Sequence, residues 1–378
     1  MNDHHRTEAI VTRRPSLAPW SAAEPVSLPL ATRWNIALER ARRWEFWPAW
    51  LYYLPIIGWI LWLGVKHRSW TAFTAANPAI EAGGVVGERK HQALGPLQAN
   101  APELVACFVL IDERFAPLRL SAAFDFAEKH GYPVVLKPDV GSRGRGVYIA
   151  RDGQGLRDYL ERFDGDVIAQ RYVEGEEYGV FVARKPGETQ PRVLSIVNKT
   201  FPGIVGDGKR RLRELILADA RARLIASALF ARWSAQLDEV PLAGERIELV
   251  EIGAHCRGSL FLDAGKLATP ALVTTLTRLL DAVPGYGFGR IDLRVTSAAH
   301  LSRGEGLQVI ELNGVTAESA HIYQPGTPLL TGYRAMFSQW ALAFEIGQAN
   351  ARLGAKITGP FELLRRFRDD LKRGEHWF

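Results

Sequence analysis

Three oxygen-bearing side chains near the end of this 378-residue chain have the spacing of a cation site. Asp292 lies in one predicted strand, and Glu311 and Asn313 lie in the next. Because strand side chains alternate between faces, Glu311 and Asn313 point the same way, and two adjacent antiparallel strands would bring all three onto one face. Carboxylate and amide oxygens suit Mg²⁺, which also bridges carboxylates to phosphates. We therefore predict a magnesium site for two ions at Asp292, Glu311 and Asn313.

A lysine and a glycine-rich segment further upstream have the chemistry to bind a polyphosphate. Lys137 follows the apolar run Val134–Leu136, and a lysine leaving a buried strand can direct its charge at a phosphate. The glycines that follow let backbone N–H groups approach an anion closely. The predicted phosphate contacts are Lys137, Gly141, Ser142, Arg143, Gly144 and Gly146. The alternative for this segment is a basic hairpin turn, because glycine motifs alone are frequent false positives.

Arg290 precedes Asp292 by two residues and is therefore predicted to share its face of the strand. Two interpretations remain open for this pair. Arg290 can serve a reaction beside the cation site, or Arg290 and Asp292 can form a buried structural ion pair with Glu311 as a further partner.

The order of these motifs resembles the ATP-grasp superfamily, particularly its ligases of the D-alanine:D-alanine ligase and cyanophycin synthetase type. The resemblance covers about residues 115–345 and extends through Val167–Val180. It implies that Gln170, Arg171 and Val173 hold the adenine base through backbone groups and that Glu177 takes the ribose hydroxyls. It also implies a catalytic role for Lys199, a second phosphate-facing lysine, and for Arg290, which would steady the charge that develops on the substrate.

Two segments depart from the pattern of the amino-acid ligases. The loop after the second metal-binding strand is Gly314–Tyr323, and His255–Asp263 lacks the small-residue run that binds an amino acid in those ligases. We predict that four polar residues of these segments recognise the substrate: His255, Arg257, Ser319 and His321. Each can instead be a hydrogen-bonded structural residue.

Composition and charge narrow the classes of molecule that this protein can bind. The net charge of +6 is modest, and the basic residues are scattered rather than gathered in a stripe, so we expect no nucleic-acid partner. An anionic nucleotide or an anionic membrane surface suits this balance. The two cysteines, Cys107 and Cys256, supply neither a disulfide framework nor a zinc-type cluster.

Residues 31–68 predict a basic amphipathic helix followed by an uncharged run, Phe46–Val65, which is long enough to cross a membrane. Pro48 and Pro55 argue against one straight helix, and the many aromatic residues favour a water–lipid boundary. Three interpretations stay open: peripheral or monotopic membrane contact, a membrane span, or burial within the protein. Basic residues flank the run on both sides, so we expect a cytoplasmic protein that can associate with the inner face of the membrane.

The pattern of predicted helices and strands in the rest of the chain indicates an α+β fold with the two lobes of an ATP-grasp protein. We expect a short strand at Thr71–Asn77, a long helix at Leu212–Leu237 and a strand at Ile247–Ile252. The predicted domains are a flexible tail (1–30), the helical segment (31–68), a small leading subdomain (69–114), the ATP-grasp domain (115–345) and a helical C-terminal extension (346–378).

Together these features predict an ADP-forming ligase that uses ATP and Mg²⁺ to activate a small-molecule carboxylate for attack by an amine. Two alternatives remain. The protein can be an ATP-grasp phosphotransferase that does not join its substrates, or a nucleotide-binding, membrane-associated scaffold without catalysis.

Overall fold

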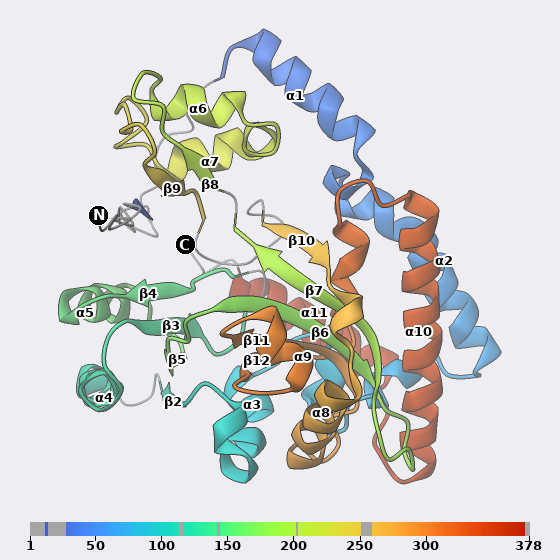
Figure 1. Ribbon diagram of the computed structural model, residues 1–378. Coiled ribbons are helices and arrows are strands. Elements are labelled where there is room, and N and C mark those ends of the chain that lie inside the picture. Colours follow the sequence, from blue (N-terminus) through green and yellow to red (C-terminus); the bar gives the residue numbers. More distant parts are fainter. Residues whose placement is uncertain are drawn as a thin grey trace, which may run out of the picture. The chain divides into compact units, whose positions relative to one another are not determined.

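The computed structural model describes residues 12–13, 28–112, 116–141, 144–201, 203–250 and 259–374 (Figure 1). Four predicted site residues lie outside these ranges: Ser142, Arg143, His255 and Arg257. Most of the predicted tail (1–30) also lies outside them. The chain divides into two compact units, one with residues 1–47 and 200–260 and one with residues 48–199 and 261–378. The domain boundaries drawn from the sequence stay predictions.

The larger unit contains two sheets, which correspond to the two predicted lobes. The four-stranded sheet has the order β2-β5-β3-β4. Its strands are β2 (Phe108–Ile111), β3 (Val134–Pro138), β4 (Tyr148–Ala150) and β5 (Val167–Arg171). Helices α4 (Ala116–His130) and α5 (Gly153–Arg162) pack on each other and on this sheet (Figure 1). The mixture of helices with antiparallel strands confirms the predicted α+β class.

The five-stranded sheet has the order β10-β7-β6-β11-β12. Its strands are β6 (Glu176–Ala183), β7 (Arg192–Thr200), β10 (Leu260–Asp263), β11 (Phe288–Val295) and β12 (Gln308–Asn313). The helices of this lobe are α3 (Lys90–Asn100), α8 (Pro270–Ala282) and α9 (Ala298–Arg303), with the 3₁₀ turns η3 (Glu81–Gly84), η4 (Pro102–Leu104) and η8 (Gly265–Leu267).

Strand β11 shows why charged residues gather on one face of this sheet. Ile291, Leu293 and Val295 pack into an apolar core with residues of α3 and α8. Because side chains alternate along a strand, the intervening Arg290, Asp292 and Arg294 belong to the opposite face. The apolar face fixes the register, and the register in turn fixes where the charges lie.

Helices α2 (Ala49–Lys66), α10 (Leu329–Arg352) and α11 (Pro360–Gly374), with the 3₁₀ turns η2 (Ala72–Ala75) and η9 (Ala320–Tyr323), complete the larger unit. Pro55 lies inside α2, so the helix continues through it. A proline removes one hydrogen bond from a helix interior, and the contacts that α2 makes with α10 offset that loss. In the described part of the chain, α2 is the one helix that is long and apolar enough to cross a membrane.

The smaller unit is built around the buried Trp233. It contains β1 (Thr12–Arg13), α1 (Leu30–Arg42), η1 (Trp44–Phe46), β8 (Gly203–Val205), α6 (Leu212–Ala218), η6 (Ala222–Ile225), α7 (Ala226–Arg232) and β9 (Arg246–Glu248). The three strands form a sheet of order β1-β9-β8.

Three of the predicted elements differ in the structure. The strand predicted at 71–77 is the 3₁₀ turn η2, which packs so closely on α10 that a Cβ at Gly347 would lie 2.0 Å from the Ala72 carbonyl oxygen. The helix predicted at 212–237 is divided, because the Asp219 carboxylate accepts hydrogen bonds from the N–H groups of Arg221 and Ala222 and begins a new turn. The strand predicted at 247–252 is the shorter β9, and residues 251–252 lie outside the described ranges.

Candidate active site

The predicted metal ligands lie on paired antiparallel strands, as the sequence indicated. In the register of β11 and β12, Asp292 is opposite Glu311 and Arg290 is opposite Asn313. Gly289 permits this close pairing, because a Cβ there would lie 1.9 Å from the Asn313 carbonyl oxygen. The residue also has φ of 152°, a conformation that favours glycine. The prediction that the three oxygen-bearing side chains share one face is confirmed, while their role as metal ligands stays a prediction.

Asp292 is buried and is surrounded by donors. Arg290 donates from Nε to Oδ1 (2.8 Å) and from Nη2 to Oδ2 (3.1 Å). The Lys199 Nζ lies 3.0 Å from Oδ1, and the Asn313 Nδ2 donates to Oδ2 at 3.2 Å. Burial opposes ionisation, yet the cations Arg290 and Lys199 hold the pKa of Asp292 below its usual range. The Arg290–Asp292 ion pair of the structural alternative is therefore present.

Glu177, predicted to bind the ribose, extends this network across the sheet. In the strand register it is opposite Lys199 on β7 and opposite Arg294 on β11. The Lys199 Nζ lies 3.1 Å from its Oε1, and the Arg294 Nη2 lies 3.1 Å from its Oε2. Both carboxylate oxygens thus already have a cationic partner, and the ribose role remains a prediction.

Lys137 reaches this sheet from the four-stranded sheet. Its Nζ donates to Oε1 of Gln170 (2.9 Å) and to the carbonyl oxygen of Ile310 (2.8 Å), the residue before Glu311. Among the described residues no carboxylate forms an ion pair with it, and burial lowers the pKa of Lys137 to about 8. The structure therefore places a buried ammonium next to β12, the strand that carries Glu311, and the Glu311 carboxylate only partly opposes the lowering of the Lys137 pKa by burial.

The glycine-rich segment connects two antiparallel strands, β3 and β4. Gly144 and Gly146 adopt left-handed conformations with φ of 70° and 68°. The Tyr159 hydroxyl donates to the Gly146 carbonyl oxygen (2.7 Å), and the Lys90 Nζ donates to that of Gly141 (2.5 Å). The segment has the hairpin topology of the alternative interpretation, and its phosphate contacts stay predictions.

Two charged residues of this site, Glu88 and Lys90, were missed by sequence reasoning. The Lys90 Nζ lies 3.5 Å from Oε1 of Glu311, and the Glu88 Oε2 accepts a hydrogen bond from the Gly314 N–H (3.3 Å). Burial, and then the charge of Glu311, raises the pKa of Glu88 to about 8. The charged triplet after the glycines at 83–87 was the available signal, but its partners lie more than 200 positions away in the sequence.

Asp139 anchors this triplet to the end of β3. Its carboxylate is fully buried and accepts hydrogen bonds from the backbone N–H of His91 (2.8 Å) and from the guanidinium of Arg89 (3.3 Å). The Lys90 N–H donates to the Asp139 carbonyl oxygen. The start of α3 is thus fixed two residues beyond Lys137, which positions Lys90 beside Glu311.

The residues predicted to hold adenine are partly engaged with the protein. The Gln170 side chain is buried between Lys137 and the Ala106 carbonyl oxygen (3.0 Å). The Arg171 N–H donates to the Cys107 carbonyl oxygen, and the Val173 carbonyl oxygen accepts from Arg294 (3.0 Å). An adenine base would have to use the remaining backbone groups of residues 170–173. The adenine contacts therefore stay predictions.

The predicted substrate residues that the structure describes lie beyond β12. The Ser319 N–H donates to Oε1 of Gln339 on α10 (3.0 Å). His321 is half-buried, burial lowers its pKa, and its Nδ1 has no hydrogen-bond partner among the described residues. No hydrogen bond or ion pair in the described ranges joins either residue to Asp292, so the structure does not bring them into the charged network.

The donor set fits a magnesium ion that completes its coordination with phosphate and water. Among the described residues, no three His, Cys, Asp or Glu side chains cluster closely enough to hold a metal by themselves. Asp292 and Glu311 are two carboxylates in register, and Asn313 uses its amide nitrogen toward Asp292, which leaves its amide oxygen for other contacts. Mg²⁺ typically takes one or two carboxylates plus substrate phosphates rather than a closed protein cage.

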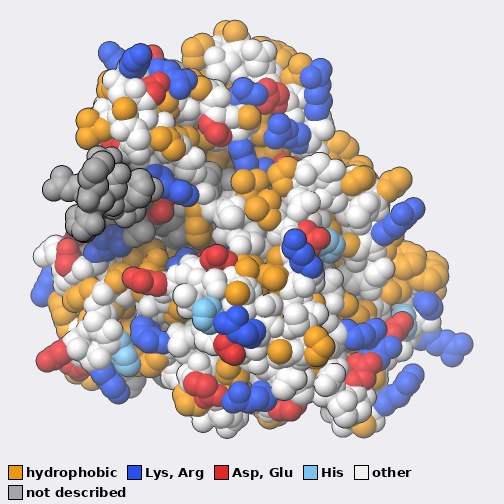
Figure 2. Space-filling model, in the orientation of Figure 1, with side chains coloured by type: hydrophobic (Ala, Val, Ile, Leu, Met, Phe, Trp, Pro, Cys, Tyr) orange, Lys and Arg blue, Asp and Glu red, His pale blue; other side chains and the backbone are white. Residues whose placement is uncertain are grey.

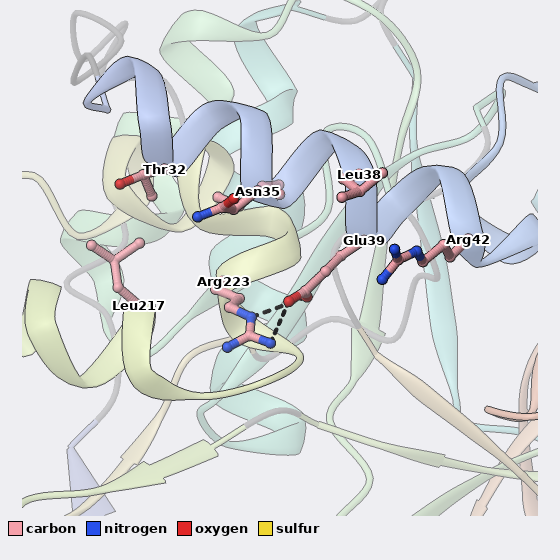
Figure 3. A pocket seen from close by; sticks show the side chains of 8 residues that line it. Thr32, Asn35, Leu38, Glu39, Arg42, Leu217 and Arg223 are labelled. Carbon is pink, nitrogen blue, oxygen red and sulfur yellow. Dashed lines mark hydrogen bonds and ion pairs between the residues drawn. The ribbon is translucent and has the colours of Figure 1, made fainter.

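A separate cavity of about 350 Å³ lies in the smaller unit, between α1 and the segment that contains α6 and η6 (Figure 3). Glu39 and Arg223 face each other there in a bidentate ion pair, with distances of 3.1 and 2.6 Å. None of the residues that the sequence analysis selected lines this cavity. Because Glu39 and Arg223 compensate each other there, we assign the cavity no role in the chemistry.

Comparison with known proteins gives matches to parts of the chain. Residues 113–168, which include Lys137 and the glycine-rich segment, match the model of the carbamoyl-phosphate synthase L chain ATP-binding domain. A segment of 57 residues is 33% identical to a D-alanine–D-alanine ligase of Clostridium botulinum, covering 14% of this chain and 19% of that protein. A segment of 61 residues is 44% identical to N-acetylaspartylglutamate synthase A of Mus musculus, covering 16% of each.

Both curated relatives are matched over less than a fifth of their own length. Among solved structures, D-alanine–D-alanine ligase from Bacillus anthracis is 17% identical, with a TM-score of 0.38 over 70% of this chain and 67% of that chain. A similarity this low carries no argument. The family-model match over residues 113–168 and the two sequence relatives instead support the predicted resemblance to the ATP-grasp superfamily.

Proposed function

We propose that this protein is an ATP- and Mg²⁺-dependent ligase that joins a small-molecule carboxylate to an amine. The γ-phosphoryl group passes from ATP to a carboxylate oxygen, which gives an acyl phosphate and ADP. The amine nitrogen then attacks the acyl carbon, the phosphate leaves with the electrons of the broken C–O bond, and the nitrogen loses a proton. ATP and Mg²⁺ point to the cytoplasm as the compartment of this reaction.

The observation that carries the proposal is the convergence of cations and carboxylates from two sheets on one strand. Lys137 donates to the backbone of β12 beside Glu311, while Lys199 and Arg290 contact Asp292 directly opposite. ATP carries several negative charges, so a site for it needs preorganised cations, and the Lys137 ammonium donates only to neutral oxygens among the described residues. Transfer of a phosphoryl group depends mainly on such positioning and charge stabilisation.

Each residue then has a distinct role. Lys137 and Lys199 would neutralise the phosphates. Arg290, whose planar guanidinium already forms two bonds to Asp292, would donate to the oxygen that becomes negative when the amine attacks. Asp292, Glu311 and Asn313 would hold magnesium, which supplies charge neutralisation at the phosphate oxygens when bound.

The test is ADP release from ATP by the purified chain in a pool of metabolite carboxylates and amines, with Glu311→Gln as the variant. We expect Mg²⁺-dependent ADP release by the wild type and a loss of about 100-fold or more in the variant, because a metal-binding carboxylate is removed without a change of shape. Glu305→Gln is the matched control, since Glu305 is exposed and pairs only with Arg303 among the described residues.

The products distinguish the proposal from its two alternatives. An amide detected by mass spectrometry supports the ligase. A phosphorylated product without an amide identifies a phosphotransferase. ATP binding without ADP release in any pool identifies a non-catalytic scaffold, and normal turnover by Glu311→Gln contradicts the metal role.

A further inference from the structure

One face of α2 exposes a continuous row of large apolar side chains. Their positions differ by three or four residues, which is the spacing that places side chains on one side of a helix. This apolar stripe consists of Trp50 (70% exposed), Leu54 (63%), Ile57 (50%), Leu61 (53%) and Val65 (63%). Hydrophobic side chains gather at the right-hand edge of the molecule in Figure 2, where α2 lies in Figure 1. An exposed apolar patch of this kind marks an interaction surface.

The opposite face of α2 is fixed to α10 along its whole length. The Tyr52 ring stacks on Tyr333 (centroids 5.4 Å apart), and the Trp59 indole N–H donates to the Phe337 carbonyl oxygen (2.9 Å). At the far end, the His67 Nδ1 lies 2.8 Å from Oε1 of Gln348. The partners advance along both helices in the same direction, so the two helices run parallel and in contact throughout.

This attachment decides how the stripe can meet a membrane. α10 carries charged side chains along its length, among them Arg334 and Glu345, and Glu345 forms an ion pair with Lys185 (2.6 Å). If α2 crossed the hydrocarbon core, α10 and its charges would have to enter with it, at a cost of several kcal/mol for each charged group. The stripe is therefore suited to lie along a lipid surface, with α10 above it.

The charges around the stripe select the kind of surface. No Asp or Glu occurs between Glu45 and Glu81, while Lys66 and Arg68 follow the last residue of the stripe. The Lys66 ammonium lies 5.2 Å from the centroid of the Trp62 ring. Tryptophan near both ends of an aliphatic row, next to basic residues, is the arrangement found where a helix lies between lipid headgroups and acyl chains. An apolar stripe that paired with a second copy of the chain would not need the basic residues Lys66 and Arg68 at its end.

We propose that the apolar stripe of α2 lies flat in the headgroup region of an anionic lipid surface, with Lys66 and Arg68 directed at the lipid phosphates. Among the three interpretations of this segment, the geometry thus favours monotopic contact over a span and over burial. The contact is independent of the ligase reaction, because none of the residues in the stripe contributes to the charged network around Asp292.

Sedimentation of the full-length chain with sucrose-loaded vesicles tests the proposal. We expect binding to vesicles of phosphatidylcholine with 30% phosphatidylglycerol, weaker binding to phosphatidylcholine alone, and weaker binding in high salt. The variant Leu54→Gln/Ile57→Gln/Leu61→Gln should reduce partitioning by about ten-fold or more, because three exposed aliphatic groups no longer enter the acyl region. Lys66→Gln should reduce binding to the anionic vesicles by about five-fold.

The matched control replaces three exposed apolar residues elsewhere, Leu118, Val240 and Leu242, by Gln. It should bind as the wild type does, and circular dichroism and urea unfolding should show that both triple variants are folded. Carbonate extraction should release the bound wild type. Resistance to carbonate would overturn the flat orientation in favour of a span. Failure to bind anionic vesicles, or a dimer that only the stripe variant abolishes, would overturn the lipid assignment.

Discussion

The two sheets of the larger unit handle buried charge in opposite ways. In the five-stranded sheet every buried charge of the central network has an oppositely charged partner: Glu177 has Lys199 and Arg294, and Asp292 has Arg290 and Lys199. In the four-stranded sheet, Lys137 is also buried, but its ammonium donates only to neutral oxygens of Gln170 and Ile310 among the described residues.

This difference distinguishes the paired charges of the five-stranded sheet, which stabilise the fold, from the Lys137 charge, which is available to bind an anion. A buried ion pair becomes costly when one partner is removed, because the other charge is left without compensation. A buried ammonium that has only neutral partners already bears that cost. We infer that the five-stranded network stabilises the fold, whereas Lys137 reduces stability and is complementary to an anion.

The largest expected effect is on the paired network. Asp292→Asn removes the carboxylate that compensates both Arg290 and Lys199, so we expect the free energy of unfolding to fall by about 3–5 kcal/mol in urea titrations. Asp281→Asn is the matched control, because Asp281 pairs with Arg184 at 2.6 Å but is 63% exposed, and a surface pair contributes about 0–1 kcal/mol. Equal effects of the two substitutions would contradict the comparison.

The second effect is a pH dependence that Lys137 contributes and the paired network does not. The folded-state pKa of Lys137 is about 8, whereas its ordinary value is 10.5. Between these values the unfolded chain binds more protons than the folded chain, so stability rises with pH, by roughly 3 kcal/mol across the window. Below pH 8 the full cost of the buried charge is present.

Urea unfolding at pH 7.5 and pH 10 measures this rise, and Lys137→Met should remove it. Other groups titrate in both proteins, so the difference between wild type and variant isolates Lys137. The same rise in the two proteins would show that Lys137 is compensated in the folded state, and the contrast between the two sheets would be lost.

Sequence reasoning found the parts of this site that depend on short-range periodicity. Glu311 and Asn313 share a face because strand side chains alternate, and the pairing of their strand with the strand of Asp292 places Asp292 opposite Glu311. Lys137 could be selected because it directly follows an apolar run. These inferences need only the local pattern and the assumption that two successive strands pair.

The rest could not be predicted, because it depends on contacts between distant segments. Glu88 and Lys90 reach Gly314 and Glu311 only after the leading segment folds onto β12. Arg294 becomes the partner of Glu177 through the pairing of β11 with β6, which no local pattern specifies. The same limit applies to α2, whose continuation through Pro55 depends on its packing against α10.

The third effect concerns ATP. Lys137→Met should weaken ATP binding by about 10- to 100-fold in titration calorimetry, because a hydrogen bond to a charged group contributes about 1.5–3 kcal/mol. At pH 7 the variant should be no less stable than the wild type. Lys129→Met, which removes an exposed lysine from α4 of the same lobe, should leave ATP affinity unchanged. Lost stability with unchanged affinity would reverse the role assigned to Lys137.

The smallest effect comes from giving Lys137 a counter-charge, which would make the four-stranded sheet resemble the five-stranded one. In Gln170→Glu, one carboxylate oxygen would lie where the Lys137 ammonium now donates at 2.9 Å. The other would face the Ala106 carbonyl oxygen, which now accepts from the amide, so the gain from the pair is offset and stability should change by less than about 1 kcal/mol.

ATP affinity should nevertheless fall by about three- to ten-fold, because the phosphates then compete with a carboxylate for the same ammonium. The pH-dependent rise in stability should also move to higher pH, since an adjacent carboxylate raises the pKa of a lysine. Unchanged ATP affinity together with a shifted pH dependence would mean that the charge of Lys137 is not what the nucleotide uses.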